Sequence, residues 1–113
     1  MAGPDLDIVR GTLDLILLKT LSWGPMHGLG IVRWIETVTR QQLLVEEGAL
    51  YPALHRLEER GWLRAEWGLT PEGRRAKYYT LTPRGRQQLA AETSRWTRYA
   101  TAMDRILAAE GNV

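Results

Sequence analysis

Apolar residues recur at helical spacing in two segments of the first forty residues. In the first segment the recurring positions are Leu13, Ile16, Leu17, Thr20 and Leu21. The Gly24-Pro25 pair that follows is a helix stop, so the first predicted helix ends before it. A second helix is expected from residue 26 or 27 to about Thr39.

Two glycines interrupt the second predicted helix near its start. Gly28 and Gly30 each lower the helix propensity by about 1 kcal/mol relative to alanine. A cost of this kind indicates that the backbone approaches another helix or a ligand closely at this point.

The third predicted helix spans residues 48–60 and separates an apolar face from a polar one. Leu50, Leu54 and Leu57 share one face when successive residues are placed about 100° apart. The opposite side carries Gly48, Ala49, Pro52, His55, Arg56 and Glu59. Pro52 is expected to cost no hydrogen bond, because the first four amides of a helix have no intrahelical partner.

Alternating residues after the third helix predict an antiparallel hairpin and then a long helix. The stretches WLRAEWG and AKYYTLT flank the turn LTPEGRR. Thr82 is the expected N-cap of the last helix and Pro83 its first residue, and the helix can run to about Glu110.

The last predicted helix carries a heptad-like apolar stripe. Its members are Leu89, Thr93, Trp96, Ala100, Met103 and Leu107. A helix of about 25 residues is about 37 Å long. So small a domain cannot cover the whole stripe, so a partner helix is expected.

Charge and composition narrow the class of protein. The chain has 113 residues, no cysteine and a net charge of +2, so disulfides, thiolate zinc sites and cysteine nucleophiles are excluded. Residues 1–61 hold six basic and eight acidic side chains, and residues 62–113 hold nine and five, which gives −2 and +4. The apolar run LDLILLKTL is too short to span a bilayer. A cytoplasmic protein with a basic carboxyl-terminal half is expected.

No constellation of residues predicts catalysis, a metal site or a cofactor. His27 and His55 are the only histidines and lie 28 positions apart, which makes a poor zinc set. The adjacent glutamate pairs at 46–47 and 58–59 point to different helix faces, and neither Ser22 nor Ser94 has a nucleophile context. We therefore expect no enzyme, no metal and no cofactor.

The order of predicted elements is that of a winged helix-turn-helix with a long C-terminal helix. This fold is mainly α with a small antiparallel hairpin (α+β). Residues 1–82 are expected to form the DNA-binding part, and residues 83–113 the C-terminal dimerisation helix of the same compact domain.

Three sequence blocks carry a family resemblance. They are GPMHG at residues 24–28, GALYPALHRLEERGW at 48–62 and GRRAKYYTLTPRG at 73–85. In this order and spacing they resemble the PadR-like family of transcriptional regulators, from Gly11 to about Leu107. The chain departs from the usual family pattern in GLGI at residues 28–31, where the family more often has an aromatic residue and an acid.

The resemblance implies a homodimeric repressor that binds double-stranded DNA at a palindromic operator. The helix at 48–60 would read the operator and the wing at 68–77 would contact phosphates. The expected DNA-binding residues are His27, Gly28, Gly48, Ala49, Tyr51, Pro52, His55, Arg56, Arg74, Arg75 and Lys77. The expected dimer interface comprises Leu89, Trp96, Ala100, Met103 and Leu107.

Trp96 has a second expected role. In the compact branch of the family, a tryptophan on the last helix stacks flat aromatic ligands at the dimer interface, and Trp96 matches it. The partners implied are thus DNA, a second copy of the chain and a small aromatic effector.

Simpler interpretations of the same residues remain open. Trp96 can pack the dimer without any ligand. Arg56 can pair with Glu59 on an exposed surface, and the basic turn can be merely solvated. The alternative function is a ligand- or protein-binding winged-helix module that does not read a DNA sequence.

Overall fold

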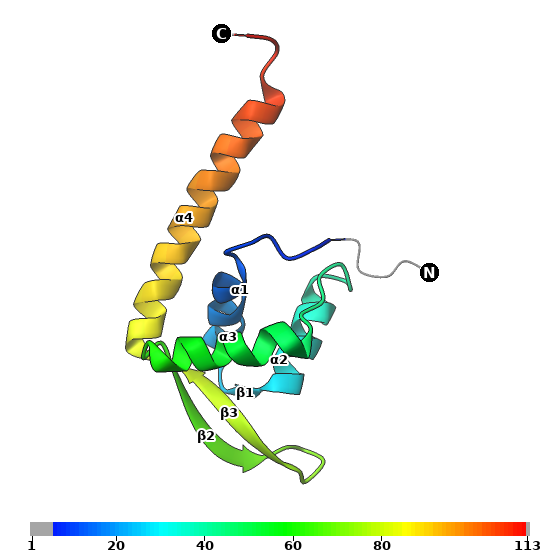
Figure 1. Cartoon of the computed structure of the whole chain (residues 1–113), viewed down its shortest axis with the longest axis vertical. Helices are drawn as coiled ribbons and strands as arrows, with labels where there is room; N and C mark the ends of the chain where they lie inside the picture. The colour runs from blue at the N-terminus through cyan, green and yellow to red at the C-terminus, as the bar shows by residue number, and fades with distance from the viewer. Residues whose placement is uncertain (1–5, 113) are drawn as a thin grey trace.

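The computed structural model describes residues 6–112. Its elements follow one another as α1 (Leu13–Thr20), the 3-10 helix η1 (Leu21–Trp23), β1 (Met26–His27), α2 (Gly28–Val38), α3 (Glu47–Glu59), β2 (Leu63–Leu69), β3 (Arg75–Leu81) and α4 (Pro83–Ala108). The three shorter helices pack together, the β2–β3 hairpin projects at one end, and α4 starts beside the base of the hairpin and extends in the opposite direction (Figure 1). The winged helix-turn-helix prediction is confirmed.

The core lies where α1, α2 and α3 meet the base of the hairpin. Its buried members are Leu17, Leu18, Leu21, Ile31, Ile35, Val45, Leu50, Ala53, Leu54, Leu57, Leu63, Tyr79 and Leu81. The leucine face predicted for α3 is therefore the inner face. Burying each of the leucine, isoleucine and valine side chains stabilises the fold by about 1.5–3 kcal/mol.

The sheet has one strand more than the hairpin that was predicted. Its order is β1-β3-β2, all antiparallel, and Met26 and His27 pair with Tyr79 and Tyr78 of β3. These two residues were expected to start the second helix. Instead His27 is an extended N-cap with φ −88° and ψ 169°, and α2 begins at Gly28.

Pro52 lies inside α3, contrary to the expectation that it would cost no hydrogen bond. The helix begins at Glu47, and the amide of Leu50 already donates to the carbonyl of Glu46 at 2.9 Å. Residue 52 is thus beyond the free amides, and its missing N–H leaves the carbonyl of Gly48 without an intrahelical donor.

The joint between the wing and α4 is tightly packed. Thr82 is the N-cap as predicted, since its hydroxyl accepts from the Gly85 amide at 3.0 Å. The same hydroxyl donates to the Gly61 carbonyl at 2.7 Å, and the Thr82 amide donates to the Trp62 carbonyl at 3.1 Å. Gly85 is buried, and a Cβ there would lie 2.1 Å from the Trp62 carbonyl oxygen. The first turn of α4 is therefore fixed to the segment that joins α3 to β2.

The far half of α4 is largely exposed, while its near half packs on the rest of the chain. Leu89, expected in the dimer stripe, packs against the protein's own core. Trp96 and Met103 are 41% and 37% exposed and Leu107 is 75% exposed, whereas Ala100 is half-buried. Tyr99 and Ile106, which the stripe did not include, are also exposed and widen it.

Candidate nucleic-acid interface

A narrow exposed ridge runs along α3 opposite its buried leucines. It consists of Gly48, Pro52, His55 and Glu59, and we call it the reading ridge. Nothing lies within 4 Å of a Cβ built on Gly48. His55 Nε2 is 3.5 Å from Glu59 Oε1, and these side chains are 71% and 69% exposed. The ridge thus offers a small apolar surface, an imidazole and a carboxylate, the groups that can contact thymine methyls and base edges.

One flank of α3 carries Arg56 and Arg60 and is tied to α1. Arg56 Nη2 donates to Asp14 Oδ1, and Arg60 Nη1 lies 3.7 Å from Asp14 Oδ2. Neither arginine pairs with Glu59. Arg56 therefore points toward α1 and away from the reading ridge, and Ala49 is exposed on the same flank.

The other flank of α3 contacts α2 and the wing. Tyr51 packs on Gly28, because a Cβ at Gly28 would lie 2.3 Å from the Tyr51 hydroxyl oxygen. Lys77 Nζ on β3 lies 3.9 Å from Glu58 Oε1. Burial, with smaller contributions from Glu58 and Tyr51, raises the pKa of Tyr79 above its ordinary value of 10.0, so its hydroxyl stays neutral beside this flank.

The start of α2 is lined by aromatic rings. His27 lies 5.3 Å from Tyr78, centroid to centroid. A Cβ at Gly30 would lie 3.3 Å from the His27 ring. Gly28 thus accommodates a ring from another helix, as predicted, whereas the ring beside Gly30 belongs to the N-cap of the same helix. The free amides of the first turn of α2 lie beside Tyr51 and His27, and such amides favour anions.

The wing tip is a short, well-ordered turn that carries cations. The Gly73 amide donates to the Thr70 carbonyl at 2.8 Å, and the Thr70 amide donates to the Arg74 carbonyl at 2.8 Å. Gly73 has φ +82°, which favours glycine. Arg74 and Arg75 are exposed on this turn, and within residues 6–112 neither has an ion-pair partner.

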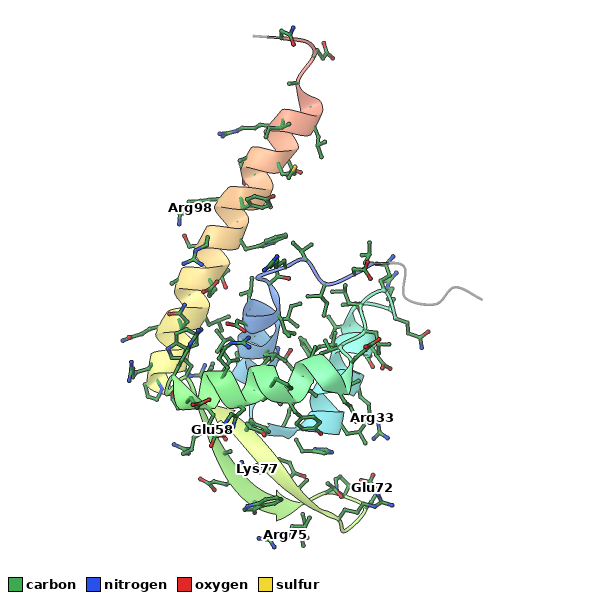
Figure 2. The ribbon with its side chains drawn as sticks, viewed as in Figure 1. Arg33, Glu58, Glu72, Arg75, Lys77 and Arg98 are labelled. Atoms are coloured by element: carbon green, nitrogen blue, oxygen red, sulfur yellow. The ribbon has the colours of Figure 1, made fainter. Side chains whose placement is uncertain are left out.

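Arg33 is a cation that the sequence analysis missed. It is exposed on α2, opposite the buried Ile31 and Ile35, and no carboxylate of the described chain pairs with it. Figure 2 shows Arg33 on the same side of the molecule as Glu72 of the wing tip. Its helical spacing from Ile31 and Ile35 could have indicated an outward side chain. Its place relative to the wing depends on tertiary packing.

Trp96 on α4 faces the segment that precedes α1. It lines a hollow of about 380 Å³ together with Val9, Arg10, Gly11, Thr12, Leu15, Glu92, Arg95 and Tyr99. A second hollow of about 330 Å³ on the side of Leu6, Ile8 and Leu43 also includes Trp96. The Trp96 and Tyr99 ring centroids are 6.0 Å apart. The neighbourhood is apolar and open, which suits a flat apolar molecule or a partner's side chains.

The described residues contain neither a candidate metal site nor a candidate membrane-spanning helix. Among residues 6–112 there is no group of three His, Asp or Glu side chains close enough to hold a metal ion. Over the same residues, no helix is both long and apolar enough to cross a bilayer.

The chain is similar to known regulators in sequence and structure. It is 32% identical over 83 residues to the transcriptional regulator Rv3488 of Mycobacterium tuberculosis H37Rv, covering 74% of each protein. The structure of smu.1704 from Streptococcus mutans UA159 matches with a TM-score of 0.81 and 27% identity, over 96% of this chain and 98% of that one. A transcriptional regulator from Clostridium thermocellum matches with a TM-score of 0.79 and 28% identity, over 87% and 95%.

The family match covers more than half of the chain. Residues 17–91 match the model of the transcriptional regulator PadR-like family, from α1 into the near half of α4. Because this match spans the three helices, the wing and the joint to α4, the chain is a transcriptional regulator rather than an enzyme, and it belongs to the PadR-like family.

Proposed function

We propose that the chain is a cytoplasmic, dimeric repressor that reads a palindromic operator with α3 and contacts phosphates with the wing. The observation that carries this proposal is the juxtaposition of the reading ridge with an unpaired cationic wing tip. Lys77 and Glu58 link the wing to α3 (Figure 2), so the two surfaces have a fixed relation. In a winged helix, α3 enters the major groove and the wing meets the flanking backbone.

The distribution of cations predicts different roles in DNA binding for the reading ridge and the wing tip. The reading ridge carries no arginine or lysine, and Arg56 and Arg60 on its flank are paired with Asp14. The exposed Arg64 of β2 is paired with Glu66, whereas Arg33, Arg74 and Arg75 are exposed and no carboxylate of the described residues pairs with them. Affinity should therefore come mainly from these arginines, while His27, Gly28, Tyr51 and the ridge residues fix register and discriminate bases.

The salt dependence of binding tests this division. With Arg33, Arg74, Arg75 and Lys77 each neutralising one phosphate, a dimer makes about eight contacts, and the slope of log affinity against log salt is about −7. The Arg74→Ala, Arg75→Ala double variant removes about four contacts. Its slope should fall in magnitude by about 3.6, and all DNA sequences should be weakened alike.

The measurement uses fluorescence anisotropy with DNA from upstream of the protein's own gene. Arg98→Ala is the control, since Arg98 is an exposed cation on α4, far from the wing (Figure 2). It should leave the slope unchanged. A wing variant that kept the wild-type slope would remove the wing from the proposal.

We propose that the far half of α4 pairs with its copy and that Trp96 can stack a small aromatic effector there. The exposed side chains of Trp96, Tyr99, Met103, Ile106 and Leu107 support the pairing, and the hollow beside Trp96 supports the ligand. Planar aromatic compounds should quench the fluorescence of the wild type more than that of Trp96→Leu. Equal quenching of both would leave Trp96 as a packing residue only.

The effector hypothesis has a separate test of coupling. If ligand at α4 changes the spacing of the two DNA-binding parts, saturating ligand must change operator affinity. Unchanged affinity despite demonstrated binding would rule out release by ligand. The acidic, cation-poor reading ridge favours one alternative, a module that binds ligand or protein without reading DNA. That alternative predicts no operator protection at physiological salt.

A further inference from the structure

One face of the wing continues the hydrophobic core beyond the helices. Along this face the paired residues are Leu63 with Leu81, Ala65 with Tyr79, Trp67 with Lys77 and Leu69 with Arg75. The first two pairs are buried or half-buried in the core. The other two pairs lie beyond the core. Trp67 and Leu69 are 60% and 71% exposed there, beside Lys77 and Arg75. Side chains two apart on a strand share a face, so these four form one patch.

Trp67 and Arg75 contact each other directly within this patch. The guanidinium carbon of Arg75 lies 4.7 Å from the Trp67 ring centroid. They are diagonal neighbours across β2 and β3, a spacing that long side chains can bridge. The stacking limits the directions in which Arg75 can point, so less freedom remains to be lost when it binds an anion.

The patch faces the same side as α3. Lys77, which is paired with Trp67 across the strands, reaches Glu58 of α3, and Figure 2 shows these two side chains where the wing meets α3. Tyr78 on the reverse face fixes the strand, since its hydroxyl donates to the Leu69 carbonyl at 2.9 Å and its ring leaves no room for a larger residue at Gly68. The patch is therefore held rigidly beside the reading ridge.

We propose that Trp67, Leu69 and Arg75 form a clamp for one sugar–phosphate strand of double-stranded DNA. The Trp67 ring and the Leu69 side chain lie against deoxyribose, and Trp67 holds the Arg75 guanidinium toward a phosphate. This inference rests on the proposed function and adds a positioning residue to it. DNA backbone is the occupant because it alternates apolar sugar with anionic phosphate, as the patch alternates apolar side chains with cations.

The test compares Trp67→Leu, Trp67→Phe and Arg75→Ala in operator titrations. Trp67→Leu removes the aromatic ring and should weaken the dimer's affinity about tenfold, on specific and unrelated DNA alike. Trp67→Phe retains an aromatic ring, so it should lose much less affinity than Trp67→Leu. In the Arg75→Ala background, Trp67→Leu should cost clearly less than in the wild type, because the two side chains act together.

A second exposed tryptophan provides the matched control. Trp23 lies in η1, outside the wing strands; it is 65% exposed, and Lys19 Nζ of α1 lies 4.8 Å from its ring centroid. Trp23→Leu thus removes a similar cation–aromatic pair and should leave DNA affinity within about twofold of wild type. Thermal unfolding and size-exclusion chromatography of each variant confirm that fold and oligomeric state are retained.

The outcomes separate this inference from the proposed function. Failure of the wild type to bind any DNA overturns the proposed function and the clamp with it. Wild-type binding with unchanged affinity in Trp67→Leu overturns the clamp alone. Equal losses from Trp67→Leu with and without Arg75 would also overturn it, because the ring would then not act through the guanidinium. If Trp67→Leu does not fold, Trp67→Phe and Arg75→Ala still decide the matter through their salt slopes.

Discussion

The position of the Tyr51 ring on α3 depends on a glycine of α2. Gly28 lowers the helix propensity of α2, and the space that it leaves is filled by the Tyr51 ring. The ring is 46% exposed, so it lies at the edge of the reading ridge rather than in the core. The close approach was predictable from the glycines. Its partner was not, because Tyr51 lies on the next helix.

Gly28→Ala should therefore change binding more than stability. The obstructing atom is the end of an exposed side chain, which can swing away, so the free energy of unfolding should change by less than about 1 kcal/mol. Operator affinity should fall as far as in Tyr51→Ala, and combining the two substitutions should add nothing further. Urea unfolding and anisotropy titrations measure both effects. Additive losses would show that Gly28 does not act through Tyr51.

The ion-pair partner of Arg56 could not be predicted from the sequence around Arg56. Its outward position on α3 was predictable from helical spacing, but Asp14 lies 42 positions earlier in the chain and no local pattern joins the two. The ion pair depends on how α1 and α3 pack. For the same reason, Arg33 and Trp67 became candidates only when α2 and the wing could be placed beside α3.

At the scale of elements, long periodic segments were predicted well and short ones were not. The apolar period identified α1, α3 and α4, and the alternation identified β2 and β3. β1 has only two residues, so it shows no period, and it forms because β3 offers an open edge after the Gly24-Pro25 stop. The joint at Thr82 was predictable because a threonine N-cap and a proline in the first turn are local signals.

α3 carries a defect that a single substitution can repair. Pro52 removes a hydrogen bond inside the helix, and its ring is exposed on the reading ridge. Pro52→Ala should raise the free energy of unfolding by about 1–3 kcal/mol, because the amide of residue 52 can then donate to the Gly48 carbonyl. Chemical denaturation compares the variants. As control, Pro71→Ala in the exposed wing turn removes a proline where no helical bond can form. Equal effects of the two would contradict this account of α3.

At the scale of the whole molecule, α4 is joined to the three shorter helices and the wing through a packed joint. Gly85→Ala should disrupt that joint, because its Cβ would meet the Trp62 backbone carbonyl, which cannot swing aside as a side chain can. We expect a loss of about 2–4 kcal/mol in the free energy of unfolding. Differential scanning calorimetry measures the change. Gly48→Ala, where no atom obstructs the new methyl group, should instead be neutral or stabilising by up to about 1 kcal/mol.

The packed joint also makes α4 a rigid lever. The helix has 26 residues and is about 39 Å long, and Thr82 leaves no flexible linker at its base. A tilt of about 5° at the far end therefore displaces the base by about 3 Å, close to the rise of one base pair. In the proposed dimer, two such levers joined at their tips would convert a small angular change into a mismatch of one step along the operator. If α4 pairs as proposed, the angular tolerance of that pairing sets how strictly the distance between half-sites is measured.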